Sequence, residues 1–181
     1  MVYKFKLVSD EVSNFSREYE IDSSASFLQL RNTILDSVDY SKEDMDSFFL
    51  CDDDWDRQEE ITLADMGTSD DQDIWIMEDT PLNELIEEEG QKLVFVFDYL
   101  TDRCFYMEMK EFIPGRSLSD PICTLKKGKA PAQYVDIDEM EGKVDQASIS
   151  SVGLDLDDIY SDDQYDDEDI ASGFDIDTNI N

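Results

Sequence analysis

The chain has 181 residues, with 47 acidic and 14 basic side chains, a formal net charge of −33 and no histidine. A chain of this length fits one domain with an appendage. Its negative field repels nucleic-acid phosphates and anionic membrane surfaces, because binding to either begins with Lys and Arg side chains. We therefore expect neither direct nucleic-acid binding nor membrane binding, and we expect the partner to present a basic protein surface.

The N-terminal stretch MVYKFKLVSDEV lacks the long apolar core and the small-residue cleavage site of a secretory signal. No apolar run approaches the roughly 20 residues that span a bilayer. Cys51, Cys104 and Cys123 are too scattered for a disulfide framework or a paired-cysteine metal site. We therefore expect a cytoplasmic location, and the oligomeric state stays open.

The first predicted elements are two strands and a helix. Apolar and charged residues alternate over 2–8 and 17–21, which predicts an antiparallel pair joined by a polar loop. Apolar residues then recur at helical spacing over 27–38, and Ser24 is the predicted N-cap. A hairpin followed by a helix is also compatible with a β-grasp-like opening.

The middle of the chain predicts shorter elements. Strands are expected in DSFFLC, residues 46–51, and DIWIM, residues 73–77, with a short strand or turn at 61–67. TPLNELIEEEG, residues 80–90, predicts a short helix that is capped by Thr80.

The most hydrophobic part of the chain lies in residues 92–109. Apolar residues occupy both faces of 93–97, which predicts a central strand that is buried on both sides. The alternation in 104–112 predicts the returning strand of a hairpin. Asp98 is expected to fix the connecting turn, either by accepting backbone N–H bonds or by pairing with Arg103.

No strand or helix is predicted in 113–134, which contains several Pro and Gly residues, and the domain is expected to end at 134. From residue 131 to the end the chain has 16 acidic residues and one base. Such a segment cannot pack against its own repulsion, so 135–181 is predicted to be a disordered acidic tail. It could be a solubilising tail or a binding arm whose apolar groups dock on a basic partner. The aromatic residues expected to dock are Tyr160, Tyr165 and Phe174.

The segment DDDWDRQEE, residues 52–60, invites comparison with a calcium loop. Asp52, Asp54 and Asp56 would fill the first, third and fifth positions of an EF-hand. The sixth position is not Gly and the twelfth is not Glu, so the pattern fails. The segment is therefore predicted to be a solvated acidic loop between strands, in which the three aspartates are only weak metal candidates.

No catalytic site and no cofactor site is predicted. The commonest general base and zinc ligand is absent, and none of the 7 glycines lies in a phosphate-binding pattern. Cys104 could act as a nucleophile only if its neighbour Arg103 or another group lowered its pKa. We expect a non-enzymatic accessory or interaction protein. The alternatives are a divalent-cation-binding or carboxylate-based enzyme, and an inactive passenger of a mobile element.

Several motifs follow one another in the order found in one protein family. NFSREYEI resembles a Trp-Arg-Arg strand of that family, and FLQLRNTILDSVDYSKEDMDSFFL resembles its signature helix and following strand, with Asp44 at the position of a histidine. MEDTPLNELIEEEGQKLVFVFDY resembles a helix that leads into an aromatic-acid motif, and DPICTLKKGKAPAQY a closing Pro-x-Cys segment. The chain therefore resembles the plasmid pRiA ORF-three-like proteins, which include TnpR-like passengers of insertion sequences.

This resemblance implies an α+β domain over 1–134, in which helices pack on one face of a mostly antiparallel sheet. It implies no reaction. Arg103 stands where the family has Trp. Asp44 and Phe105 stand where it has His, so both family histidines are missing here. The family-motif positions that this chain retains are Arg17, Phe48, Phe97, Asp98, Tyr99 and Cys123.

Overall fold

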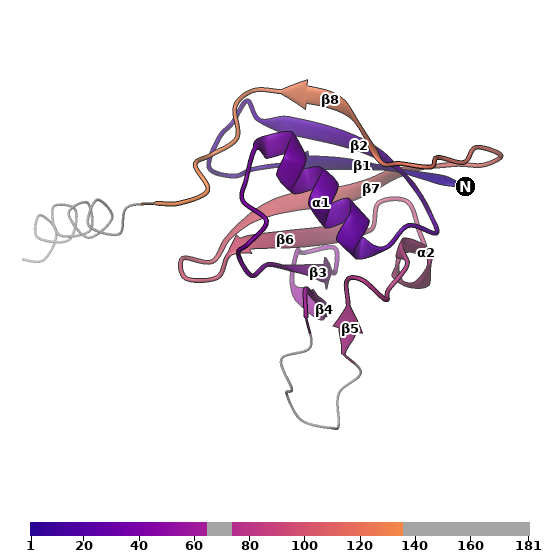
Figure 1. The fold of residues 1–181 in the computed structure, drawn as a ribbon, viewed down its shortest axis with the longest axis horizontal. Helices are drawn as coiled ribbons and strands as arrows, with labels where there is room; N and C mark the ends of the chain where they lie inside the picture. The colour runs from indigo at the N-terminus through magenta and orange to yellow at the C-terminus, as the bar shows by residue number, and fades with distance from the viewer. Residues whose placement is uncertain (65–73, 136–181) are drawn as a thin grey trace, which may run out of the picture. The chain divides into compact units, whose positions relative to one another are not determined.

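The computed structural model describes residues 1–64 and 74–135. Within them, an eight-stranded, mostly antiparallel sheet carries helices on one face (Figure 1), which confirms the predicted α+β class. The elements in chain order are β1 (Val2–Val8), β2 (Ser16–Asp22), α1 (Phe27–Val38), β3 (Ser47–Cys51), β4 (Arg57–Thr62), β5 (Trp75–Ile76), α2 (Leu82–Leu85), β6 (Lys92–Asp98), β7 (Arg103–Ile113) and β8 (Ile122–Lys127).

The strand order across the sheet is β5-β4-β3-β6-β7-β1-β2-β8. All pairs are antiparallel except β4 with β5, which run parallel. The β1–β2 and β6–β7 hairpins lie side by side, because β1 also pairs with β7. This pairing brings the β1–β2 loop and the β6–β7 turn to the same end of the sheet.

α1 begins two residues later than Ser24 would place it. Ser26 is the N-cap: its hydroxyl accepts from the N–H of Gln29, and the Gln29 side chain accepts from the N–H of Ser26. This reciprocal capping box satisfies two otherwise unpaired donors. Ser24 instead donates its hydroxyl to Asp22, so the prediction of Ser24 as the cap was wrong.

α2 is a single turn, and its predicted cap was also wrong. Thr80 donates its hydroxyl to the carbonyl of Ile76, and Pro81 occupies the N-cap without a side-chain bond. The turn is held to the segment before α1, since Leu82 N–H donates to Ala25 O and Asn83 N–H to Ser23 O. The short helix is thus fixed by tertiary contacts, since so short a helix has little stability of its own.

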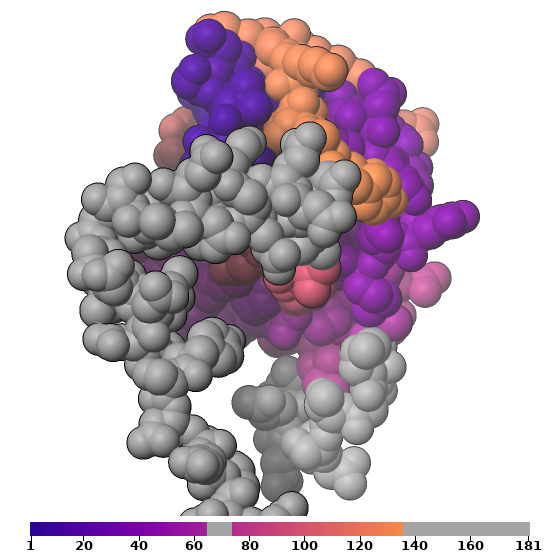
Figure 2. All heavy atoms as spheres, turned by 90° about the vertical axis from the view of Figure 1, so that its left-hand side faces the viewer, coloured from indigo at the N-terminus to yellow at the C-terminus, as the bar shows by residue number. Residues whose placement is uncertain are grey.

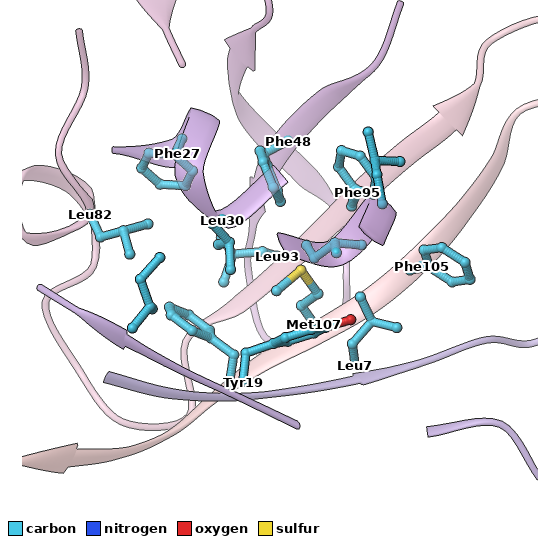
Figure 3. Packing of buried hydrophobic residues seen from close by; sticks show 14 of the residues in the cluster. Leu7, Tyr19, Phe27, Leu30, Phe48, Leu82, Leu93, Phe95, Phe105 and Met107 are labelled. Atoms are coloured by element: carbon cyan, nitrogen blue, oxygen red, sulfur yellow. The ribbon is translucent and has the colours of Figure 1, made fainter. Parts of the chain in front are cut away.

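The core lies between α1 and the sheet (Figure 3). Side chains from the helix, from β1 and β2, from β3 and from the β6–β7 hairpin meet there. The predicted two-sided burial of β6 is confirmed, because each residue from Leu93 to Phe97 is at most 3% exposed. The inward positions of β7 are also as predicted: Phe105, Met107 and Met109 are all fully buried.

The opposite face of the sheet carries a second, smaller apolar cluster. Val94, Val96 and Cys104 are buried there, and Trp55 and Tyr106 pack against them. The rings of Trp55 and Tyr106 meet edge to face with centroids 5.1 Å apart. Trp55 lies in the loop before β4, so this loop covers part of the sheet face.

β8 was not predicted. It pairs with β2 at the edge of the sheet, and most of its residues are exposed. The chain then turns at Gly128, which has φ +68. A Cβ at this position would lie 2.3 Å from the carbonyl oxygen of Asn14, so only glycine allows so close an approach to the β1–β2 loop. This turn sends residues 129–135 back across the end of the sheet.

Two predicted features lie partly or wholly outside the described residues. Of the predicted strand or turn at 61–67, residues 61 and 62 belong to β4, and residues from 65 onwards are not described. The predicted tail lies outside as well, apart from Val135, together with Tyr160, Tyr165 and Phe174.

Candidate functional site

Asp98 fixes the β6–β7 turn as predicted. Its Oδ1 accepts from the N–H groups of Leu100 and Thr101, at 2.9 and 3.3 Å, and its Oδ2 accepts from the Thr101 hydroxyl at 2.6 Å. Burial alone would raise the pKa of Asp98, but these hydrogen bonds and Arg103 bring the pKa below its ordinary value. The carboxylate is therefore held ionised by the turn.

Arg103 connects three segments at this end of the sheet. Its guanidinium donates to both carboxylate oxygens of Glu11, at 3.0 and 2.9 Å, and to the carbonyls of Ala132 and Gln133, at 2.6 and 3.1 Å. Asp98 lies 3.9 Å away, which is a weaker pairing than predicted. The side chain therefore joins the β6–β7 turn to the β1–β2 loop and to the segment after β8.

An aromatic cluster lies beneath Arg103. Phe97 and Phe105 have ring centroids 4.6 Å apart, Tyr40 lies 5.3 Å from Phe97, and Phe15 lies 5.4 Å from Phe105. The guanidinium of Arg103 sits 5.0 Å from the centre of the Phe97 ring. Phe105, at the position of a family histidine, is thus a fully buried packing residue.

Asp44, at the position of the other family histidine, is tied to the same segment. Its Oδ2 accepts from Gln133 Nε2 at 3.0 Å and from the Tyr134 hydroxyl at 2.5 Å. The neighbouring Tyr40 donates its hydroxyl to Pro131 O at 2.7 Å, and burial raises the pKa of this tyrosine. Asp44 and Tyr40 are therefore both held by residues 131–134, and Tyr40 in turn stacks on Phe105.

A cleft of about 670 Å³ opens beside this cluster. On the face shown in Figure 2, the orange segment that follows β8 lies against the purple end of α1. The cleft is bounded by Ser37 to Tyr40 on one side and by Gly128 to Tyr134 on the other, with Arg17 of β2 between them. It is larger than a second hollow of about 150 Å³, which lies on the other face of the sheet beside Trp55 and Tyr106.

Arg17 is 5% exposed, its hydrogen bonds within the described residues all go to carbonyl groups, and its guanidinium lies 4.5 Å from the centre of the Phe15 ring. Its Nε donates to Ser37 O at 3.4 Å, and its Nη1 donates to Ser16 O, Lys127 O and Gly128 O at 2.9, 2.8 and 3.2 Å. These contacts lock the end of α1 and the turn after β8 onto β2. The predicted family-motif position Arg17 thus builds the cleft.

The three candidate metal ligands form a self-contained loop. Asp52 Oδ1 accepts from the N–H groups of Asp54 and Asp56, at 2.9 and 3.0 Å. This uses the first aspartate to shape its own turn. Within residues 1–64 and 74–135, no group of three or more Cys, Asp or Glu side chains is placed to hold a metal ion. The prediction of a loop over the whole of 52–60 was too long, because β4 begins at Arg57.

The environment of each cysteine disfavours the thiolate form that a nucleophile needs. Burial raises the pKa of the Cys51, Cys104 and Cys123 thiols, and nearby basic groups only partly oppose this. Cys104 belongs to the cluster on the far face of the sheet, whereas Arg103 points to the aromatic cluster. Cys104 and Arg103 therefore do not act together.

The remaining family-motif positions are dispersed. Phe48 packs in the core against Phe95, with ring centroids 4.7 Å apart. The Tyr99 hydroxyl donates to Glu60 Oε1 at 2.9 Å and shares a second hydrogen bond with the Ser47 hydroxyl, and burial raises the pKa of Tyr99 to about 12. Cys123 lies half-buried on β8. The structure thus brings Arg17, Phe97, Asp98 and Tyr99 to one end of the sheet and leaves Phe48 and Cys123 elsewhere.

Sequence reasoning missed a buried ion pair between α1 and the residue that precedes β3. Arg31 Nε lies 2.6 Å from Asp46 Oδ1, and both side chains are at most 4% exposed. Arg31 also donates to the carbonyls of Lys42 and Asp44. The signal was available, since an arginine on the apolar stripe of a helix needs a buried partner.

The order of strands and the arrangement at this end of the sheet can be compared with known proteins. The family model described as Plasmid pRiA4b ORF-3-like protein matches residues 2–166. The chain belongs to this family. The match extends beyond residue 134, where the resemblance read from the motifs ended. The comparison with curated proteins found no match.

A solved structure of the same fold is the crystal structure of the protein of unknown function MM3350 from Methanosarcina mazei Go1. It is similar with a TM-score of 0.58 and 15% sequence identity, and the match covers 84% of each chain. At this identity the likeness concerns the fold alone. Neither helix in the described ranges has the length and apolar character that crossing a bilayer requires.

Proposed function

We propose that this family member is a non-enzymatic interaction protein that binds a basic protein surface. The main support is the way its carboxylates are displayed on the β3–β4 hairpin. We call residues 52–60 the acidic hairpin. Every aspartate and glutamate in it is exposed.

The acidic hairpin is rigid as well as charged. The Asp52 carboxylate fixes the turn, and backbone bonds join Asp52 to Trp55 and Asp56. The Trp55 ring is anchored by Tyr106 and by the Lys92 ammonium, which lies 5.1 Å from its centre. A preorganised set of charges binds a partner at a lower entropic cost than a flexible one.

Two basic side chains, Arg57 and Lys92, lie at the acidic hairpin, against its six carboxylates. Arg57 is its one basic residue, and this side chain pairs with Asp102 at 2.9 Å. Opposite charge raises the rate of encounter with a basic partner and aligns it, and both effects weaken as salt is added. The residues after 135 add further negative charge to the chain, and Tyr160, Tyr165 and Phe174 would supply apolar contacts to the partner.

Binding to a 20-residue lysine-rich peptide, followed by fluorescence anisotropy, tests this proposal. We expect the triple variant Asp53→Asn, Asp54→Asn, Glu59→Gln to bind more weakly than wild type, because these side chains make no hydrogen bonds within the described residues and are available to a partner. The matched control is Glu84→Gln, Glu87→Gln, Glu88→Gln, which removes the same charge from exposed sites near α2. If the two variants lose the same affinity, net charge alone explains the binding and the hairpin has no special role.

A second variant tests the tail within the full chain. Replacing Tyr160, Tyr165 and Phe174 with Ser leaves the net charge unchanged. Weaker binding of the same peptide is expected if these residues dock after the electrostatic encounter. Unchanged binding would assign the tail a solubilising role only.

A further inference from the structure

Arg17 differs from every other arginine of the chain. Arg31, Arg57, Arg103 and Arg116 each pair with a carboxylate, at 2.6 to 2.9 Å. Within the described residues, no carboxylate lies within 4.0 Å of Arg17, although Arg17 is among the most buried of the five. The Arg17 guanidinium lies 4.5 Å from the centre of the Phe15 ring, and buried charges are ordinarily paired, so within the described residues no anion balances the charge of Arg17.

One end of this guanidinium is open. Nε and Nη1 are occupied by the four carbonyls of Ser16, Ser37, Lys127 and Gly128, whereas Nη2 donates to no described residue. Nη2 is also absent from the fully buried polar atoms that lack a partner, the only such atom in the described part of the chain being Ser16 Oγ. Because Arg17 lines the cleft, the geometry leaves two N–H donors for a ligand there.

Apart from Arg17, the cleft is lined by both apolar and polar side chains. Val38, Ala130 and Pro131 line it, with Lys129 as the second basic side chain and Asp39 as an exposed acidic residue. A cleft of about 670 Å³ falls within the range of small-molecule sites. It combines a fixed positive group with an apolar wall, which suits a ligand that has one anionic end and an apolar body.

We propose that this cleft binds a small organic carboxylate, whose carboxylate accepts from Nη2 of Arg17 and whose apolar body lies against Val38, Ala130 and Pro131. The charge of the whole chain selects a monoanion. At a net charge of −33, each additional negative charge on a ligand is repelled, so a phosphate dianion is less favoured than a carboxylate. This site lies on other elements than the acidic hairpin and does not depend on the proposed basic partner.

Titration calorimetry on the full-length protein, with benzoate and benzamide as matched probes, tests the proposal. The two molecules have nearly the same shape, and only benzoate carries the charge. We expect benzoate to bind saturably with one-to-one stoichiometry. The affinity for benzamide should be lower by a factor of at least about ten, since a hydrogen bond to a charged group contributes on that order. Equal binding of the two, or no saturable binding of benzoate, would overturn the proposal. Competition by inorganic phosphate at the same concentration as benzoate would overturn the choice of an organic monoanion.

Two variants locate the site. Arg17→Gln should abolish the preference for benzoate over benzamide, whereas Arg116→Gln, which removes the same charge from β2's neighbourhood but outside the cleft, should preserve it. Ala132→Trp fills the cleft from an exposed position and leaves the core untouched, so it should fold even if Arg17→Gln does not. Wild-type benzoate affinity in Ala132→Trp, with circular dichroism showing a folded protein, would place the binding elsewhere and refute the assignment.

Discussion

Arg31 of α1 and Arg17 of β2 are both almost completely buried, but their charges are neutralised differently. Arg31 has Asp46 at 2.6 Å and further carbonyl acceptors. Arg17 has four carbonyls and no carboxylate among the described residues. In a chain with 47 acidic residues, a shortage of carboxylates does not explain this difference.

The two regions also differ in what they hold together. Arg31 fixes the connection between α1 and β3, which are neighbours along the chain, and its partner is 15 residues away. Arg17 fixes the turn after β8, whose carbonyls are 110 and 111 residues away. Arg31 forms a closed ion pair with Asp46, whereas Arg17 lines a cleft and donates only to carbonyl groups among the described residues. The Arg31 region is therefore structural, whereas the Arg17 region is the one that we propose as the carboxylate site.

The largest expected effect comes from breaking the closed pair. Asp46→Ala would leave Arg31 buried without a counter-charge, and we expect the free energy of unfolding to fall by about 3–5 kcal/mol. Urea unfolding followed by circular dichroism measures this change. The double variant Arg31→Met, Asp46→Ala should recover part of the loss, because it removes the unpaired charge. A loss in the single variant below about 1 kcal/mol would contradict the structural role of the pair.

A smaller loss is expected at the open site. Arg17→Met deprives four carbonyls of their donor but leaves no buried charge behind, so we expect a decrease of about 1–3 kcal/mol in the free energy of unfolding. Urea unfolding followed by circular dichroism measures this decrease. Replacing the preceding residue, Ser16, with Ala is a control for local packing. If Arg17→Met cost as much as Asp46→Ala, the contrast between the two regions would not hold.

Where the sequence predicted the fold well, the pattern was local. The two-sided apolar run of β6 and the alternation in β7 place residues 93–97 and 105–109 on their correct faces, because strand periodicity depends only on neighbours. The alternation fails at Phe112, which a register shift between β1 and β7 turns towards the core. Asp98 was assigned its correct role for the same reason, since a turn carboxylate bonds within two or three residues. The cap of α1 was missed by two residues, although Ser26 and Gln29 carry the spacing of a capping box.

What the sequence did not predict depends on distant partners. β8 is a largely exposed edge strand, so its residues show no apolar alternation, and only its pairing with β2 makes it a strand. Glu11 meets Arg103 across 92 residues, and Tyr40 meets Pro131 across 91. No local pattern records such pairs. The cleft is formed by these long-range contacts, so it could not be found before the fold was known.

Acid should weaken the turn at Asp98 more than it weakens the rest of the hairpin. The pKa of Asp98 is below its ordinary value, so its ionised form stabilises the fold at neutral pH, and this contribution is lost as the pH falls through the lowered pKa. We expect the urea midpoint of wild type to drop between about pH 4 and pH 2, and Asp98→Asn to drop less steeply over the same range. Asp53→Asn, whose carboxylate makes no hydrogen bond to a described residue, is the matched control and should follow wild type. Parallel curves for wild type and Asp98→Asn would mean that the turn does not depend on the charge.

The smallest effect is expected at the outer pair of the hairpin end. Glu11 is 34% exposed and Arg103 9%, and Arg103 keeps its bonds to Ala132 O and Gln133 O when Glu11 is changed. We expect Glu11→Gln to lower the free energy of unfolding by at most about 1 kcal/mol, as for other partly exposed pairs. Repeating the urea series in about 1 M salt should remove most of the difference, because screening acts on the solvent-facing partner. A loss of stability that persists in high salt would show that the pair of Glu11 and Arg103 is effectively buried. The hairpin end would then resemble the closed pair of Arg31 and Asp46 and not the open site at Arg17.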